Sequence, residues 1–439
     1  MNLFAQLNNV LEDMMVRWDI PGLGVGLVEE GEIVYAQAFG VQSLATGVPV
    51  TTDSLFCVAS IAKCFVACAI MQLVEQDLLC LDAPLVEFLP DFLLDADHFQ
   101  EITLRQILSH TSGIPEMDEI EYEHLVVQPE YDEESPARYV RTLSNRKMIG
   151  LPGEKFAYSN IGYNVLGYLI ARRTGKTFED YMKAHILTPA GMSDSTFFFP
   201  NVPLDRLAVP HLRIPQLVPN PVLPYHRADA PASFLYTSVN EMCRWAMTSL
   251  NRGTYFGQRL LSPGSYDQMW TPAVQRGYPP FREEMGLGWA LGHYEGFRTV
   301  AHGGGGFGWT CHLILLPEQN RAAIILCNEE SSAIECLEQA VMRALLEMEP
   351  KPGPVSWLIP IASALHTGGI QAAYANLEEI KQNPDFYLDP YDLTTLVYQL
   401  LSVRNYALAI EVLKFNLHVF PEHQDSIALL ARVATEKDG

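Results

Sequence analysis

The sequence lacks the patterns that mark several classes of protein. Its eight cysteines include no Cys-x-x-Cys pair and none of the Cys/His spacings typical of zinc sites. Only 29 lysine and arginine residues stand against 52 aspartate and glutamate residues, a net charge of −23. That charge disfavours nucleic acid and anionic membranes as partners. The longest apolar run, around 61–74, is too short to span a membrane and contains Lys63.

An export signal is also missing from the first residues of the chain, where no basic segment precedes an apolar one. Several cysteines lie inside apolar runs, which is typical of buried, reduced thiols. We therefore expect a cytoplasmic protein. The 439 residues, 48% hydrophobic and 18% charged, have a globular composition and are enough for two to three domains.

Strand patterns occur near the start of the chain and again far along it. A helix is predicted over 3–18 and a β-hairpin from 22–28 and 32–40. Strands return over 286–294, 297–304, 311–317 and 321–329. This order favours an α+β domain over 1–350, with its sheet part in about 1–75 and 260–350 and a helical lobe over about 80–255.

The Lys-Pro-Gly-Pro stretch at 351–354 predicts a boundary, and 351–439 have helical patterns only. Within them, 405–423 resemble the second helix of a tetratricopeptide-type repeat, although one repeat cannot bury its own apolar face. We favour an all-helical appendage packed on the main domain. A surface of these helices that binds a protein partner is the alternative.

Ser60 and Lys63 carry the first chemical signal. They begin an apolar helix predicted over about 60–76, and their i, i+3 spacing places them on one face. Burial and the positive end of the helix dipole both favour a neutral lysine, which beside a hydroxyl is a general base next to a nucleophile. The structural alternative is a capping serine and a lysine that extends to solvent.

Two further elements follow along the chain. Tyr158 and Asn160 lie where a loop enters a helix, and could relay a proton and orient a carbonyl, or serve only as caps and packing. His302 and a run of four glycines follow an apolar strand. Such glycines allow a ligand to approach the backbone, whose N–H groups can hold an oxyanion, although a plain hairpin turn has the same composition.

Ser-x-x-Lys, Tyr-x-Asn and His-x-Gly in this order resemble the motifs of penicillin-recognising serine enzymes. The second motif, with its tyrosine, resembles that of the class C β-lactamase and DD-peptidase branch, which includes esterase and D-aminopeptidase relatives. The stretches at 103–115 and 230–245 resemble two further signatures of that family. The resemblance covers about 5–348.

The resemblance implies a β-lactamase/transpeptidase-like fold, an antiparallel sheet flanked by helices plus a helical lobe. It implies that Ser60 is the nucleophile and that Lys63 and Tyr158 act as bases. Asn160 and His302 would contact substrate. The glycines Gly304 and Gly305 would contact substrate too, with the Gly305 and Ser60 N–H groups as oxyanion donors. No metal or cofactor is implied.

The expected reaction is hydrolysis of a small ester, amide or peptide through an acyl-enzyme. Lactam-hydrolysing relatives carry lysine at the position of His302, so we expect weak activity on carboxylate-bearing lactams. Two alternatives remain: a weak class C-type β-lactamase or D-amino-acid peptidase, favoured if another cation reaches the site, and a non-catalytic binding protein. The oligomeric state is left open.

Overall fold

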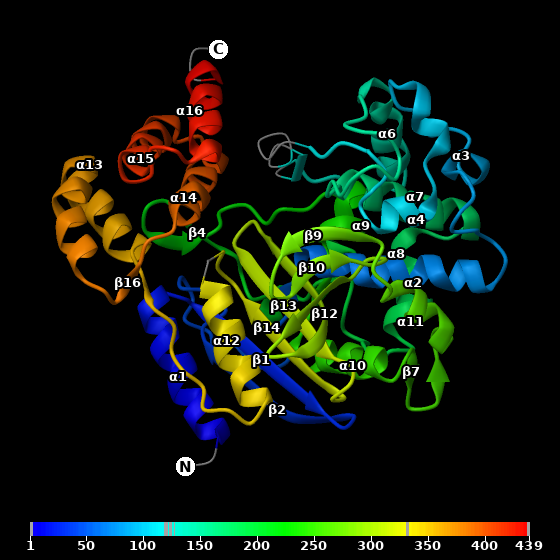
Figure 1. The fold of residues 1–439 in the computed structure, drawn as a ribbon, viewed down its shortest axis with the longest axis horizontal. Helices are drawn as coiled ribbons and strands as arrows, with labels where there is room; N and C mark the ends of the chain where they lie inside the picture. Colours follow the sequence, from blue (N-terminus) through cyan, green and yellow to red (C-terminus); the bar gives the residue numbers. More distant parts are fainter. Residues whose placement is uncertain (1–2, 118–121, 123–124, 127, 331–332, 437–439) are drawn as a thin grey trace.

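The computed structural model describes residues 3–117, 122, 125–126, 128–330 and 333–436. Its centre is one eight-stranded antiparallel sheet in the order β2-β1-β14-β13-β12-β11-β10-β9 (Figure 1). The strands are β1 (Gly22–Glu29), β2 (Glu32–Gly40), β9 (Val274–Tyr278), β10 (Arg282–Met285), β11 (Ala290–Tyr294), β12 (Phe297–Gly306), β13 (Trp309–Leu316) and β14 (Arg321–Cys327). The predicted hairpin and late strands are confirmed, whereas β9 and β10 were not anticipated.

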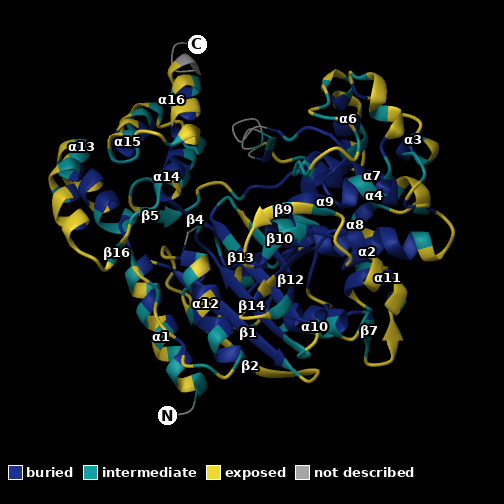
Figure 2. Cartoon of the chain, in the orientation of Figure 1, coloured by how far each residue is buried: buried dark blue, intermediate teal, exposed yellow. Residues whose placement is uncertain are grey.

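Helices cover both faces of this sheet. On one face lie α1 (Leu3–Trp18) and α12 (Ala333–Leu345), and on the other α2 (Ala62–Glu75) and α10 (Val239–Leu250). Because side chains alternate along a strand, Val25 of β1 packs toward α1 and α12. Its neighbour Gly26 faces α10, where an added Cβ would lie 2.4 Å from the Cys243 sulfur. The strands β1, β13 and β14 are buried, whereas the edge strands β2 and β9 are largely exposed (Figure 2).

The helical lobe is inserted between the early and the late strands of the sheet. Its helices are α3 (Leu85–Phe88), α4 (Leu104–Leu108), α6 (Ser135–Thr142), α7 (Asn160–Thr174), α8 (Phe178–Met182) and α9 (Ala230–Ser233), and α11 (Pro263–Met269) follows α10. Shorter turns are η1 (Ala59–Ile61), η2 (Asp97–Glu101), η3 (Leu143–Asn145), η4 (Lys183–Leu187), η5 (Phe199–Asn201), η6 (Leu204–Arg206) and η7 (Arg227–Asp229). Short strand pairs are β3 (Phe56–Cys57) with β6 (Tyr236–Thr237), β4 (His211–Arg213) with β5 (Leu217–Pro219), and β7 (Thr254–Tyr255) with β8 (Gln258–Arg259).

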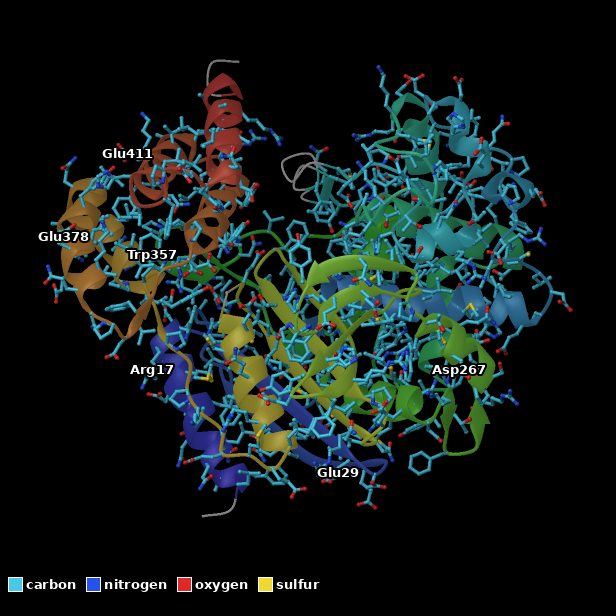
Figure 3. The ribbon with its side chains drawn as sticks, in the orientation of Figure 1. Arg17, Glu29, Asp267, Trp357, Glu378 and Glu411 are labelled. Atoms are coloured by element: carbon cyan, nitrogen blue, oxygen red, sulfur yellow. The ribbon has the colours of Figure 1, made fainter. Side chains whose placement is uncertain are left out.

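The C-terminal unit has its own apolar core. Its described helical segments are α13 (Leu358–Gln382), which a kink at Gly369 divides into two helices, α14 (Pro390–Ser402), α15 (Tyr406–Val419) and α16 (Gln424–Glu436). Trp357 stacks on Phe415 at the base of this core (Figure 3). The expectation of an all-helical extension is wrong in one detail. A two-residue parallel pair joins β15 (Val355–Ser356) to β16 (Phe386–Tyr387), because the chain runs extended on both sides of α13.

The eight cysteines are all free thiols, and six of them are buried. Among the described residues, no helix is both long and apolar enough to cross a membrane. The cytoplasmic location and the domain boundaries at 1–350 and 351–439 stay predictions.

Candidate active site

Ser60 lies in η1, a single 3-10 turn that leads directly into α2. The residue before it, Ala59, has a φ of 44°, a left-handed conformation that costs energy for any residue with a Cβ. The prediction that Ser60 belongs to the first turn of the helix is therefore slightly wrong, because the chain turns sharply before α2 starts. This turn presents Ser60 at the surface of a hollow of about 340 Å³ while Ala59 and Ile61 are buried.

Lys63 is completely buried, and its Nζ lies among three oxygen atoms. The amine is 3.0 Å from Ser60 Oγ, 2.6 Å from Asn160 Oδ1 and 2.8 Å from the Ala232 carbonyl oxygen. Three acceptors match the three N–H bonds of an ammonium, whereas a neutral amine donates fewer and keeps a lone pair. The expectation that Lys63 is neutral at rest stays a prediction. The 3.0 Å between Lys63 Nζ and Ser60 Oγ is within the reach over which a neutral amine could take the hydroxyl proton.

Asn160 begins α7, whose first turn is capped by the hydroxyl of Ser159. The Asn160 backbone N–H donates to the carboxylate of Glu116, which also accepts a hydrogen bond from Met117 N at 2.8 Å. This carboxylate thereby fixes the start of α7, and with it the amide that contacts Lys63. Sequence reasoning missed Glu116, although it directly follows the signature stretch at 103–115.

Tyr158 lies over the lysine, with its ring centroid 5.0 Å from Lys63 Nζ. The imidazole of His110 stacks on this ring with a centroid distance of 4.2 Å and accepts a hydrogen bond from Ser159 N. Burial lowers the pKa of His110 well below its usual value, so it is a neutral packing partner that orients Tyr158. The role of Tyr158 as a base beside Lys63 stays a prediction.

Strand β12 brings the glycine run against the nucleophile turn. A Cβ on Gly304 would lie 2.1 Å from the Val58 carbonyl oxygen and 3.1 Å from Ser60 N, so only glycine allows this approach. Gly305 follows it at the rim of the hollow that contains Ser60. Their part in substrate binding, and the oxyanion role of the Gly305 and Ser60 N–H groups, stay predictions that this close approach supports.

His302 also lines the hollow, but without a positive charge. Burial lowers the pKa of this imidazole well below its usual value, and the nearby Lys63 lowers it further. Its Nδ1 lies 2.6 Å from the Gly303 carbonyl oxygen, so Nδ1 carries the proton and donates it there. A neutral His302 is what we expected at the position where lactam-hydrolysing relatives carry lysine.

Arg276 of β9 supplies a cation that sequence reasoning missed. It lines the hollow together with Ser60 and Tyr158, and its guanidinium carbon lies 6.0 Å from the Tyr158 ring centroid. Burial lowers the pKa of this guanidinium, but arginine stays charged in proteins. Its Nε is buried and has no hydrogen-bond partner among the described residues.

These groups can carry out nucleophilic catalysis without a metal. A hydroxyl next to a buried amine can attack a carbonyl, an amide side chain can orient that carbonyl, and backbone N–H groups can stabilise the oxyanion. Within the described ranges, no group of three or more His, Cys, Asp or Glu side chains could hold a metal ion.

Glu116 gives the site a measurable pH dependence. Burial raises its pKa from 4.5 to about 7. Between these values the folded protein keeps a proton that the unfolded chain has lost, so stability falls as pH rises from about 4.5 to 7 and levels off beyond it. We expect the free energy of unfolding of Glu116→Gln, measured in urea across this range, to vary less with pH. If the free energy of unfolding of Glu116→Gln varied with pH as steeply as that of the wild type, the dependence would belong to another group.

Comparisons with known proteins identify a family for most of the chain. A family model described as Beta-lactamase matches residues 7–345. Penicillin-binding protein 4 of Amycolatopsis lactamdurans is 28% identical over 318 residues, covering 70% of this chain and 81% of that protein. Protein flp of Staphylococcus aureus strain MW2 is 24% identical over 75% of this chain, which spans only 64% of flp.

Solved structures show the same fold. An octameric penicillin-binding protein homologue from Pyrococcus abyssi has a TM-score of 0.68 at 23% identity, over 83% of this chain and 81% of that one. D-amino acid amidase from Ochrobactrum anthropi SV3, complexed with L-phenylalanine amide, has a TM-score of 0.66 at 22% identity, over 79% and 98%. The fold is therefore that of β-lactamases and transpeptidases, and the chain belongs to the Beta-lactamase family of serine hydrolases.

Proposed function

We propose that the protein hydrolyses a small ester or amide by transferring its acyl group to Ser60 and then to water. The contact between Lys63 Nζ and Ser60 Oγ, 3.0 Å in a buried setting, carries this proposal. Lys63 takes the hydroxyl proton as the oxygen attacks, Tyr158 delivers a proton to the leaving group, and water then releases the acyl group. Such a contact also argues against a purely binding role, which would need no activated hydroxyl.

Ser60→Ala tests this proposal. We expect the turnover of p-nitrophenyl acetate to fall by at least ~10³-fold, because the remaining groups only bind and polarise the ester. Ser144→Ala, a serine outside the hollow, is the matched control. Turnover close to that of the wild type in Ser60→Ala would remove Ser60 from the mechanism.

A second candidate is a peptidase or lactamase activity on substrates whose leaving group carries a carboxylate. Arg276 favours it, because a charged guanidinium lies in the same hollow as Tyr158 and arginine forms strong charge-assisted hydrogen bonds with carboxylates. The D-amino acid amidase likeness is consistent with small amide substrates. The net charge of −23 works against anionic ligands, but salt screens such charges beyond about 8 Å.

Arg276→Met separates the two candidates. The substrates are 4-acetoxybenzoate and its methyl ester, which differ mainly by a carboxylate on the leaving group. If Arg276 holds that carboxylate, kcat/KM for the acid should fall about tenfold relative to the ester, since a hydrogen bond to a charged group contributes about that much. Equal changes for both substrates would exclude this role and leave the neutral ester or amide as substrate.

A further inference from the structure

A second, larger hollow opens beside the nucleophile. Its volume is about 670 Å³, and it shares Gly305 with the hollow that contains Ser60. Asn160, whose side-chain oxygen contacts Lys63, also lines it. Because one glycine of β12 and the amide that orients the substrate border it, a group bound there would be continuous with the scissile bond.

Helix α14 of the C-terminal unit forms one wall of this hollow. The lining residues recur at i, i+3, i+4, i+7, i+8 and i+11, which is one face of a helix. They are Tyr391, Thr394, Thr395, Tyr398, Gln399 and Ser402. The opposite face, with Leu393, Leu396 and Leu400, packs in the core of the C-terminal unit.

This face of α14 is neither charged, as on a solvent-facing helix, nor apolar, as on a packed one. A solvent-facing helix surface carries charged residues, and a packed surface is apolar. Here every lining residue of the helix is uncharged, and each has a hydroxyl or an amide. By contrast, the charged Glu378 and Glu411 lie on the side of the unit away from the catalytic part (Figure 3).

The wall opposite α14 comes from the catalytic part and is largely apolar. It includes Met117, Tyr122, Leu212, Val222 and Phe307. Among the charged lining residues, the acidic Glu116 and Glu330 outnumber the single basic Arg404. A hollow of this composition suits an uncharged group with amide bonds and an aromatic or apolar end, and it disfavours an anion.

Helix α14 is held in place against the catalytic part. Gln399 accepts a hydrogen bond from Arg213 N of β4 at 2.6 Å, and this contact is buried. The Arg213 guanidinium in turn lies 3.0 Å from the Asp19 carboxylate. At the start of the unit, Trp18 donates to the Pro354 carbonyl oxygen at 3.1 Å. These contacts hold both α14 and the first residues of the C-terminal unit against the catalytic part.

The position of Tyr158 tells which part of a substrate faces α14. Tyr158 lines only the smaller hollow, and in the proposed reaction it delivers a proton to the leaving group. The leaving group then occupies the smaller hollow, and the acyl group extends along Asn160 and Gly305 into the larger one. We infer that the C-terminal unit forms the acyl subsite and selects substrates with an extended, uncharged, amide-containing acyl group that ends in an aromatic or apolar group. This inference rests on the proposed function.

Two esters with the same leaving group test it. One is p-nitrophenyl acetate, and the other is the p-nitrophenyl ester of N-benzyloxycarbonylglycine, whose acyl group adds an amide-like carbamate and a phenyl ring. Tyr398→Ala should lower kcat/KM for the long ester about tenfold relative to the acetate, because it removes an aromatic wall of the subsite. Thr395→Trp, which fills the hollow instead of enlarging it, should shift the same ratio in the same direction.

Tyr387→Ala is the matched control, because it deletes the same side chain from an exposed position outside the hollow. Its ratio should equal that of the wild type, and thermal melts should show that all three variants are folded. An unchanged ratio in both α14 variants, or an equal shift in the control, would overturn the inference.

A binding measurement separates this inference from the proposed function. N-benzyloxycarbonylglycinamide is titrated into Ser60→Ala and into the double variant that also carries Tyr398→Ala, by calorimetry. A higher Kd in the double variant supports the acyl subsite even if the wild type hydrolyses neither ester. In that case only the hydrolase proposal fails. The same Kd in both proteins would overturn the subsite even if hydrolysis occurs.

Discussion

The buried amine of Lys63 is the constraint on which the site depends. A lysine without solvent is costly unless its N–H groups find acceptors. Here the acceptors come from three separate segments: Ser60 in η1, Asn160 at the start of α7 and Ala232 in α9. Satisfying one buried amine therefore brings the nucleophile turn, the lobe and the signature stretch at 230–245 to one point.

The surroundings divide the site into two sides. Tyr158, the neutral His302 and the charged Arg276 lie with Ser60 in the smaller hollow. Across Gly305 the larger hollow has the uncharged face of α14 on one side and largely apolar residues of the catalytic part on the other. A substrate that spans both hollows would be contacted by a cation at its leaving group and by aromatic and hydroxyl groups at its acyl end. The cation belongs to β9, and the aromatic and hydroxyl groups belong to α14.

The sequence predicted the motifs and the central sheet, because both leave local patterns. Ser60, Lys63 and Asn160 meet as expected, and the glycine run approaches the nucleophile. It did not reveal Arg276, because β9, at the edge of the sheet, and its neighbour β10 are polar and lack the alternation of a half-buried strand. The wall formed by α14 could not be predicted from the sequence either. Its uncharged face forms part of a hollow only because the C-terminal unit packs against β4.

The central claim is that Lys63 activates Ser60, and Lys63→Met tests it most directly. The substitution keeps the length of the apolar stem and removes the amine, so the variant should stay folded, as a thermal melt would show. The rate at which a fluorophosphonate probe modifies Ser60, followed by intact mass, should fall by ~10³-fold or more, because the hydroxyl has lost its base. Modification of a folded Lys63→Met protein at the wild-type rate would contradict this account.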